Sequence, residues 1–353
     1  MTVTPERRHR PTLKQIAAEA GVSIPTVSKV VKGRPDVSPE LRASIQSLLK
    51  IHGYEPRASS PVAAAAKAVE LHFDSMESSN NLQIMRGVLD AAESVGIDVV
   101  VKITPKNFAG KSWVENVANA QHSGLILVTS RMDDEQQDAF IEAGLPVVVV
   151  DPINTPRKPI ASVGVNNFMG GYSATQHLLE LGHRDIALIT GVPSECAQAR
   201  IAGYHFALHE AGIALRSDFA LPGEFRYQEG RTSALTLLSL RERPTAIFAS
   251  NDLEALGAID AARSLGLRVP EDVSVVGFDD SLQAVTASPR LTTVRQPFRE
   301  IGATAFNALL QITGGEKLST HRLELATQLV VRESTAPFAG RGHQGDTGSS
   351  TKS

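Results

Sequence analysis

The sequence predicts an α/β protein with an N-terminal helix-turn-helix head and a body of two lobes, each built on a parallel sheet. Two observations predict this class. Residues 12–54 hold three short helical patterns around a turn glycine, and residues 69–338 alternate strand-length apolar runs with amphipathic helical stretches. Such alternation is typical of parallel sheets with helices on both faces. About ten of these units are too many for one sheet, so we expect two similar lobes.

The first helix of the head follows Thr12. Leu13, Ile16, Ala17 and Ala20 recur at the spacing that places them on one buried stripe of a helix. Gly21 stands where a helix ends in a left-handed turn, a conformation that glycine adopts without steric cost. We therefore expect a short helix that ends in a tight turn.

A second and a third helix are expected after this turn. Ser23 can cap the second helix, and Pro25 is tolerated in a first turn that has no backbone acceptors. The buried positions of the second helix are Val27, Val30 and Val31. Ser38 and Pro39 open the third helix. Its buried face is expected to consist of Leu41, Ile45, Leu48 and Leu49.

The second helix has the outer face of a helix that reads DNA. A short helix with hydroxyls and lysines outward, braced by two others, fits the major groove. Lys29 can donate to guanine, whereas Ile24 and Pro25 can make only apolar contacts, for example with a thymine methyl group. A helical bundle without a ligand is the alternative, but it leaves the cap and the basic face unexplained. The residues expected at duplex DNA are Thr12, Ser23, Ile24, Pro25, Thr26, Ser28, Lys29, Lys32 and Tyr54.

The charge of the chain is divided unevenly. Residues 1–60 contain ten Lys and Arg against five Asp and Glu, a net charge of +5. The whole chain has 35 basic and 38 acidic residues, so the rest carries 25 − 33 = −8. A basic head on an acidic body is consistent with phosphate contacts confined to the head.

Length and composition limit the other possibilities. A chain of 353 residues with 42% hydrophobic residues is globular and long enough for two or three domains. Its longest apolar runs have strand length and its N-terminus lacks an apolar signal segment, so we expect no membrane span and no export. Cys196 is the single cysteine, which fits the reducing cytoplasm and excludes an internal disulfide. We expect neither a metal nor a cofactor.

Composition changes divide the chain into four segments. Residues 1–57 form the head, and the alanine-rich residues 58–68 are expected to form a hinge linker. Residues 69–338 form the body, and the Gly/Ser-rich residues 339–353 are expected to be disordered. The predicted strands are 69–73, 98–103, 124–128, 146–150, 185–189, 245–249 and 273–278. The predicted helices include 82–95, 170–181, 200–211 and 253–265.

Polar residues follow the predicted strands of the body, at the edge where open α/β sheets bind ligands. They are Asp74, Asp151, Arg200, Asn251, Asp252, Asp279 and Asp280. Carboxylates, an amide and a guanidinium match the vicinal hydroxyls of a polyhydroxylated ligand, and Phe225 or Phe298 can cover its apolar face. For Asp252 and Asp280 we expect helix capping instead.

Several longer motifs stand out along the chain. They are T-L-K-Q-I-A-A-E-A-G-V-S-I-P-T-V-S-K-V-V-K-G in the head and L-L-E-L-G-H-R-D-I-A-L-I-T-G, S-N-D-L-E-A-L-G-A, V-S-V-V-G-F-D-D and L-T-T-V-R-Q-P-F in the body. Together they resemble the LacI/GalR family of bacterial transcription regulators along nearly the whole chain. That resemblance implies a homodimeric regulator, expected to be a repressor, whose heads bind operator DNA.

The resemblance also implies a body like that of periplasmic sugar-binding proteins, with a small-molecule effector, expected to be a carbohydrate, between the lobes. It implies three crossings between the lobes. The first lobe would hold residues 69–165 and 294–323, and the second residues 166–293 and 324–335. The family's effector contacts fall here on Asp151, Arg200, Phe225, Asn251, Asp279, Gln296 and Phe298, with Asn80 and Asn81 lining the first lobe.

The linker departs from the family pattern. The family usually carries an asparagine after Tyr-x-Pro and, further on, a leucine that wedges into the minor groove. Arg57 stands at the asparagine, Pro61 falls near the following arginine, and Ala63 stands at the leucine. We therefore assign no wedge role to Ala63.

Three alternatives remain at this point. The effector can be a purine or nucleoside instead of a sugar. An enzyme is disfavoured because the chain shows no nucleophile–base pair, metal-ligand spacing or cofactor loop. A sugar-binding transport component is disfavoured because the chain has no signal peptide and because that function leaves the head unexplained.

Overall fold

The computed structural model describes part of the head and nearly all of the body. The described residues are 13–23, 26–27, 30, 39–51, 68–76, 78–104, 111–120, 122–129, 131–157 and 159–340. The chain divides into two compact units, residues 1–65 and 66–353. Most of the expected linker and residues 341–353 of the expected tail lie outside the described residues.

The head contains the predicted helices as far as it is described. They are α1 (Leu13–Glu19) and α3 (Pro39–Ile51). Ile16 and Ala17 of α1 pack in one buried cluster with Val27, Val30 and Ile45. Gly21 has the left-handed φ of +65° that the turn requires.

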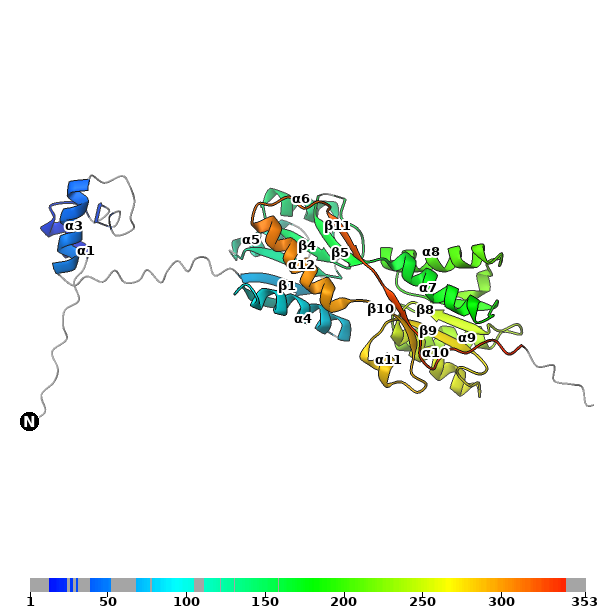
Figure 1. The fold of residues 1–353 in the computed structure, drawn as a ribbon. Helices are drawn as coiled ribbons and strands as arrows, with labels where there is room; N and C mark the ends of the chain where they lie inside the picture. Colours follow the sequence, from blue (N-terminus) through cyan, green and yellow to red (C-terminus); the bar gives the residue numbers. More distant parts are fainter. Residues whose placement is uncertain are drawn as a thin grey trace, which may run out of the picture. The chain divides into compact units, whose positions relative to one another are not determined.

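The first sheet of the body is entirely parallel, with strand order β11-β5-β4-β3-β1-β2 (Figure 1). Its strands are β1 (Ala68–Phe73), β2 (Asp98–Ile103), β3 (Gly124–Val128), β4 (Val147–Val150), β5 (Ala161–Val165) and β11 (Arg322–Leu325). Its helices are α4 (Ser79–Glu93), α5 (Lys111–Asn119), α6 (Asp134–Glu142) and α12 (Phe298–Thr313). α4 and α12 pack on one face and α5 and α6 on the other.

The second sheet has strand order β12-β10-β9-β8-β6-β7 and one antiparallel pair, β10 with β12. The expectation of a purely parallel sheet is therefore wrong at this edge. Its strands are β6 (Ile186–Thr190), β7 (Ala220–Pro222), β8 (Ala246–Ala249), β9 (Ser274–Asp279), β10 (Thr292–Arg295) and β12 (Gln328–Val330). Its helices are α7 (Asn167–Glu180), α8 (Glu195–Glu210), η1 (Ser217–Phe219), α9 (Tyr227–Leu238), α10 (Asp252–Ser264) and α11 (Leu282–Thr286).

The chain passes between the two sheets three times, after β5, after β10 and after β11. Val294 and Arg295 pair with β9 of the second sheet, and Glu324 and Leu325 pair with β5 of the first. The sequence placed these four residues in the opposite lobes, and it placed Ala68, which begins β1, in the linker. The boundaries shift because β10 and β11 each continue for two residues beyond the expected crossing.

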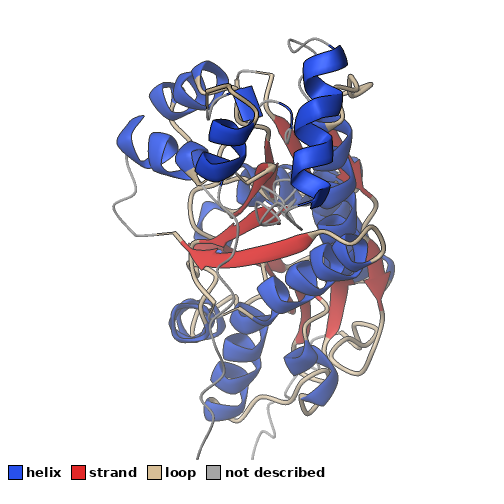
Figure 2. Ribbon diagram, turned by 90° about the vertical axis from the view of Figure 1, so that its left-hand side faces the viewer, coloured by secondary structure: helices blue, strands red, loops and turns tan. Residues whose placement is uncertain are grey.

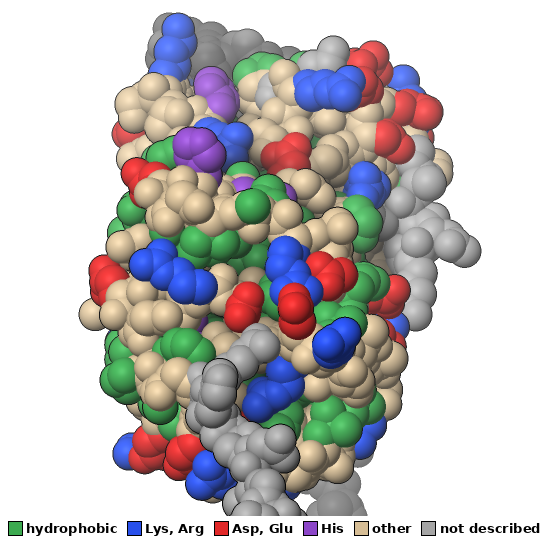
Figure 3. All heavy atoms as spheres, turned by 90° about the vertical axis from the view of Figure 1, so that its right-hand side faces the viewer, with side chains coloured by type: hydrophobic (Ala, Val, Ile, Leu, Met, Phe, Trp, Pro, Cys, Tyr) green, Lys and Arg blue, Asp and Glu red, His purple; other side chains and the backbone are tan. Residues whose placement is uncertain are grey.

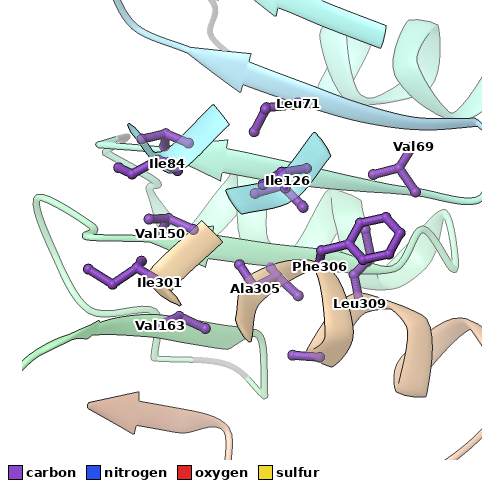
Figure 4. Close-up of a cluster of buried hydrophobic side chains, with 14 of the residues drawn as sticks. Val69, Leu71, Ile84, Ile126, Val150, Val163, Ile301, Ala305, Phe306 and Leu309 are labelled. Atoms are coloured by element: carbon purple, nitrogen blue, oxygen red, sulfur yellow. The ribbon is translucent and has the colours of Figure 1, made fainter. Parts of the chain in front are cut away.

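Each sheet is buried between two layers of helices, as the strands and helices of the body in Figure 2 show. In the first lobe, Val69 and Leu71 of β1 meet Phe306 and Leu309 of α12 in one cluster of fully buried side chains (Figure 4). Burial of such side chains contributes about 1.5–3 kcal/mol each. α12, which follows most of the second lobe in the sequence, thus completes the core of the first.

The helix pair α7 and α8 of the second lobe crosses with its two backbones in contact. A Cβ on Gly203 of α8 would lie 2.2 Å from the carbonyl oxygen of Phe168 in α7. A Cβ on Gly171 of α7 would lie 2.2 Å from the carbonyl oxygen of Arg200 in α8. This close approach fixes the position of α8 and therefore of the Arg200 side chain.

No helix in the described ranges combines the length and apolar character needed to cross a membrane. On the face drawn in Figure 3, acidic and basic side chains lie next to one another.

Candidate functional site

A cavity of about 510 Å³ opens between the two lobes, where the carboxyl ends of their strands meet. Asp74 and Asp151 follow strands of the first lobe, and Asp279 ends a strand of the second. All ten side chains that the sequence selected as effector contacts line this cavity. They are Asp74, Asn80, Asn81, Asp151, Arg200, Phe225, Asn251, Asp279, Gln296 and Phe298.

Asp279 connects the two lobes. Its Oδ2 accepts a hydrogen bond from Asn80 Nδ2 of α4 at 2.9 Å. Its Oδ1 accepts one from Gln296 Nε2, in the second crossing segment, at 2.6 Å. The carboxylate of Asp279 therefore binds one amide of the other lobe and one amide of the crossing segment. A movement of either amide alters its hydrogen bonds.

Arg200 is buried and held in one orientation. It lies in the second turn of α8, which begins at Glu195 and therefore earlier than the sequence predicted. Nε donates to Asn167 Oδ1 at 2.8 Å, and Nη1 donates to the Ser250 carbonyl oxygen at 2.6 Å. The guanidinium carbon lies 3.7 Å from the ring centroid of Phe278. Nη2 is the nitrogen left without a hydrogen bond to any described protein group, so it is the donor available to a ligand.

Asn251 and Phe225 form one hydrogen-bonded unit with Glu254. Asn251 caps α10, with its Oδ1 accepting the Glu254 N–H at 2.8 Å. Asn251 Nδ2 donates to the Phe225 carbonyl oxygen at 3.0 Å, and the Phe225 N–H donates to Glu254 Oε1 at 2.6 Å. Asn251 therefore holds the Phe225 backbone, and the Phe225 ring is the group that it presents to the cavity.

The expectation that Asp252 and Asp280 cap helices is wrong. Asp252 accepts hydrogen bonds from the Ser281 N–H at 2.7 Å and Thr293 Oγ1 at 2.5 Å, and it lines the cavity. Asp280 forms ion pairs with Arg295 and Arg332. Asn251, one residue earlier, takes the cap of α10, since it alone has the extended backbone of an N-cap residue.

Burial changes the acidity of the carboxyl groups around the cavity. It raises the pKa of Asp279 to about 6, of Asp252 to about 7 and of Glu254 to about 8. Burial also raises the pKa of Asp151, an effect that the nearby Arg200 opposes. Asp252 and Glu254 are therefore able to donate as well as accept hydrogen bonds near neutral pH.

Backbone strain is concentrated at the cavity. Six described residues other than glycine have φ between +45° and +123°, and five of them, Thr129, Asp151, Glu224, Phe225 and Asp279, line the cavity, while the sixth is Asp280. Left-handed backbone at such residues costs on the order of 1–3 kcal/mol each and persists where the surrounding structure imposes it.

Sequence reasoning missed a set of further lining residues. They are Ser75, Ser78, Ser79, Ile84, Thr129, Ile153, Val192, Ser194, Glu224, Arg226, Asp252, Leu253, Ser281 and Gln283. Cys196, the single cysteine of the chain, also lines the cavity. Ser75, Ser78 and Ser79 could have been found, because they follow Asp74 at the same strand end.

The expected DNA contacts fall mostly outside the described residues. Ser23 and Thr26 are described, and the Thr26 N–H donates to Ser23 Oγ at 3.4 Å, as the predicted cap requires. Those outside are Thr12, Ile24, Pro25, Ser28, Lys29, Lys32 and Tyr54, together with the linker residues Arg57, Pro61 and Ala63.

Comparison with known proteins identifies both parts of the chain. Residues 12–57 match the family described as bacterial regulatory proteins, lacI family, and residues 175–335 match a periplasmic binding protein-like domain. The HTH-type transcriptional regulator CelR of Thermobifida fusca is 36% identical over 343 residues, which cover 93% of this chain and 99% of CelR. The chain belongs to the LacI family.

Other members of the LacI family are similar to this chain in sequence and in structure. The HTH-type transcriptional repressor PurR of Erwinia tasmaniensis is 34% identical over 334 residues, 92% of this chain and 97% of its own. A CelR–cellobiose complex superimposes with a TM-score of 0.70 at 34% identity, over 92% of this chain and all of that chain. A lac repressor dimer bound to operator and the anti-inducer ONPF gives a TM-score of 0.70 at 30% identity, over 93% and 100%.

Membership of the LacI family decides between the functional classes. The protein is a transcriptional regulator, and the function of a sugar-binding transport component is not supported. The relatives named above are regulators and repressors of transcription.

Proposed function

We propose that this LacI-family protein represses transcription by binding operator DNA as a homodimer, and that a sugar in the cavity between the lobes changes its operator affinity. One observation carries the proposal: all ten side chains expected as effector contacts, some from their chemistry and the rest from the family resemblance, line a single cavity. The operator and the dimer are supported by the lac repressor complex, and the sugar by the CelR–cellobiose complex. A protein that binds chromosomal operators acts in the cytoplasm.

The polar groups of the cavity suit a neutral sugar. Asp151 and Asp279 accept hydroxyl protons, and Arg200 Nη2 donates. The Phe225 ring packs on the apolar face of the sugar. A volume of about 510 Å³ lies within the usual range for small-ligand sites and accommodates a disaccharide. Cellobiose is therefore the first ligand to test.

The hydrogen bond between Asp279 and Asn80 suggests how the sugar acts on the lobes. A ligand shifts a conformational equilibrium only by its differential affinity for the two arrangements. A sugar that competes for Asp279 weakens its bond to Asn80, whereas one that bridges the lobes adds to it. Either effect is expected to couple the two sites by about 1–3 kcal/mol.

Operator titration with and without cellobiose tests the proposal. Arg200→Ala and Asp279→Ala are expected to abolish the sugar response, because each removes a group that faces the ligand. Operator affinity without sugar is expected to stay within about threefold of the wild type, because the head is a separate unit. Asp272→Asn, which removes a carboxylate outside the cavity, is the control.

Two outcomes would contradict the proposal. If either variant loses operator binding but still binds the sugar, these residues serve the fold or the dimer and the effector site lies elsewhere. If cellobiose and related sugars leave the melting temperature unchanged while a purine or nucleoside raises it, the effector belongs to the alternative class.

A further inference from the structure

Gly191 stands directly after β6, next to the cavity between the lobes. The residue is buried and does not line the cavity, whereas its neighbour Val192 does. Its φ lies outside the left-handed range, so the backbone conformation alone does not require a glycine at this position. The reason for the glycine must therefore lie in the groups that surround it.

The ring of Phe225 occupies the space that a side chain at position 191 needs. A Cβ on Gly191 would lie 2.0 Å from Cζ, 2.1 Å from Cε1 and 2.6 Å from Cδ1 of this ring. Non-bonded carbon atoms in contact are about 3.5–4.0 Å apart, so an alanine and the ring in its present position exclude each other. One edge of the ring thus lies against the bare backbone of Gly191.

The backbone of Phe225 is fixed and cannot follow a displaced ring. Its N–H donates to Glu254 Oε1 at 2.6 Å, and its carbonyl oxygen accepts from Asn251 Nδ2 at 3.0 Å. Two residues earlier, the Gly223 N–H donates to the Thr190 carbonyl oxygen of β6 at 2.6 Å. The start of α10 and the end of β6 therefore hold this turn from two sides. A side chain at position 191 must move the ring instead of the backbone.

The cavity is the space into which the ring can move. Phe225 lines the cavity, whereas Gly191 closes the side of β6. The guanidinium carbon of Arg200 lies 5.7 Å from the ring centroid, and two hydrogen bonds hold this guanidinium in place. Lengthening the shortest contact from 2.0 Å to a normal distance moves the ring edge by about 1.5 Å. That movement removes part of the volume available to a ligand.

We propose that Gly191 is a positioning residue that sets the size of the sugar accepted between the lobes. Because Gly191 has no side chain, the Phe225 ring lies back against it and leaves room for a disaccharide. With alanine at this position the ring projects into the cavity, so a disaccharide is excluded more strongly than a monosaccharide. This inference rests on the proposed function, since it concerns the ring that packs on the sugar.

Calorimetric titration of the full chain with cellobiose and with glucose tests the proposal. Gly191→Ala is expected to weaken cellobiose binding at least about tenfold and glucose binding less than about threefold, because the smaller sugar tolerates a narrower cavity. The melting temperature without sugar is expected to stay within about 2 °C of the wild type, because the ring moves into open space. Gly164→Ala, whose Cβ meets no atom within 4 Å, is the matched control and is expected to bind both sugars as the wild type does.

A double-mutant cycle separates a role through Phe225 from a role in the fold. In a Phe225→Ala background no ring is left to displace, so the addition of Gly191→Ala is expected to change cellobiose binding by less than about twofold. A residue that served only the fold would weaken binding by the same factor in both backgrounds.

Crystal structures without sugar give a readout that does not depend on the ligand. In Gly191→Ala the edge of the Phe225 ring is expected to lie about 1–2 Å further into the cavity than in the wild type. The backbone hydrogen bonds of Phe225 to Glu254 and Asn251 are expected to remain. A ring that stays in place, or a backbone that shifts in its stead, overturns the proposal.

Two results of the titrations also overturn it. One is equal weakening of cellobiose and glucose binding in Gly191→Ala, and the other is the same effect of this substitution with and without the Phe225 ring. If the wild type binds neither sugar, the proposed function fails instead. The crystal structures alone then decide whether Gly191 positions the ring.

Discussion

Two lysines of the head, Lys29 and Lys32, are expected to face the DNA, where a lysine can contact either a base or a phosphate. Both are expected on the outer face of the second helix, but only a base contact carries sequence information, whereas a phosphate contact sets affinity. The expected contact of Lys29 with a guanine therefore affects which DNA sequences the protein prefers. This effect can be measured separately from that of the positive charge, which raises the affinity for every sequence.

Replacing Lys29 by alanine is expected to cost about 1–3 kcal/mol at the matching base pair and to relax specificity there. The measurement is binding to the operator and to operators altered at each position in turn. Lys32→Ala serves as the comparison. If Lys29→Ala weakens binding to every sequence equally, the lysine contacts phosphate only.

Glu254 makes the stability of the body dependent on pH. In the folded protein burial raises its pKa from 4.5 to about 8. Between these values the folded state keeps a proton that the unfolded chain has released, so the free energy of unfolding falls as the pH rises. The contribution is fully present below about pH 4.5 and is lost by about pH 8.

Comparing urea unfolding at pH 6 and pH 8 measures this effect. The wild type is expected to lose about 2 kcal/mol more than Glu254→Gln over this interval, because the variant has nothing to titrate at that position. The absolute stability of the variant is expected to be lower at both values, since its amide faces two backbone N–H donors. Glu242→Gln, at an exposed glutamate, should reproduce the wild-type slope. An equal slope in Glu254→Gln would contradict the shifted pKa.

The residues of the cavity were predictable because strand ends meet at one edge of a parallel sheet. Asp151 and Asp279 follow from that rule, whereas Asn80, Asn81 and Gln296 were expected only from the family resemblance. The roles of Asn251 and Asp252 could not be predicted, since both residues can cap a helix and only the backbone angles distinguish them. The positive φ of Phe225 leaves no trace in the sequence either.

At the level of elements, the second lobe depends on helices that touch through their backbones. Gly171 and Gly203 allow α7 and α8 to approach so closely that Arg200 reaches both Asn167 and Ser250. A side chain at either glycine must separate the helices. Fold and cavity geometry are thus linked through this crossing.

Gly203→Ala is expected to destabilise the body by about 1–3 kcal/mol, because its Cβ would lie 2.2 Å from the Phe168 carbonyl oxygen. Sugar affinity should fall with it, since α8 carries Arg200. Gly164→Ala is a matched control in β5, where a Cβ meets no atom within 4 Å. Thermal unfolding and sugar titration of both variants make the comparison. Equal melting temperatures would show that α7 and α8 can separate without cost.

Elements differ in how far the sequence predicts them. β2 and β3 lie where the apolar runs predicted them, residue for residue. β5, β7, β10, β11 and β12 were not individually predicted. β7 and β12 have three residues each and β11 alternates exposed and half-buried positions, so none of the three forms an apolar run. These three segments become strands because their backbones pair with a neighbouring strand of the sheet.

The whole molecule combines a basic head with an acidic body. The net charge of +5 in residues 1–60 and −8 in the rest concentrates attraction for DNA phosphates in the head. A single head reads only a half-site, so a palindromic operator requires two copies of the chain.

Sedimentation equilibrium at micromolar concentration is expected to give the mass of two chains. Two heads suffice for the two half-sites of a palindromic operator, and the described residues after Arg332 form no helix that could assemble with others. The measurement should be repeated with operator DNA at one duplex per two chains. A mass near four chains would contradict the dimer.

Because α12 and β11 come late in the sequence, the ribosome makes them after the whole of β1 to β5 and after most of the second lobe. When the ribosome has released β1 to β5, the face that Phe306 and Leu309 later cover is bare, and Ser162 awaits its partner Arg322. At roughly 5–20 residues per second, this unfinished half-lobe waits on the order of ten seconds while the other lobe is made. The nascent chain is thus most vulnerable to aggregation and proteolysis in this interval, and a chaperone has its longest opportunity to act then.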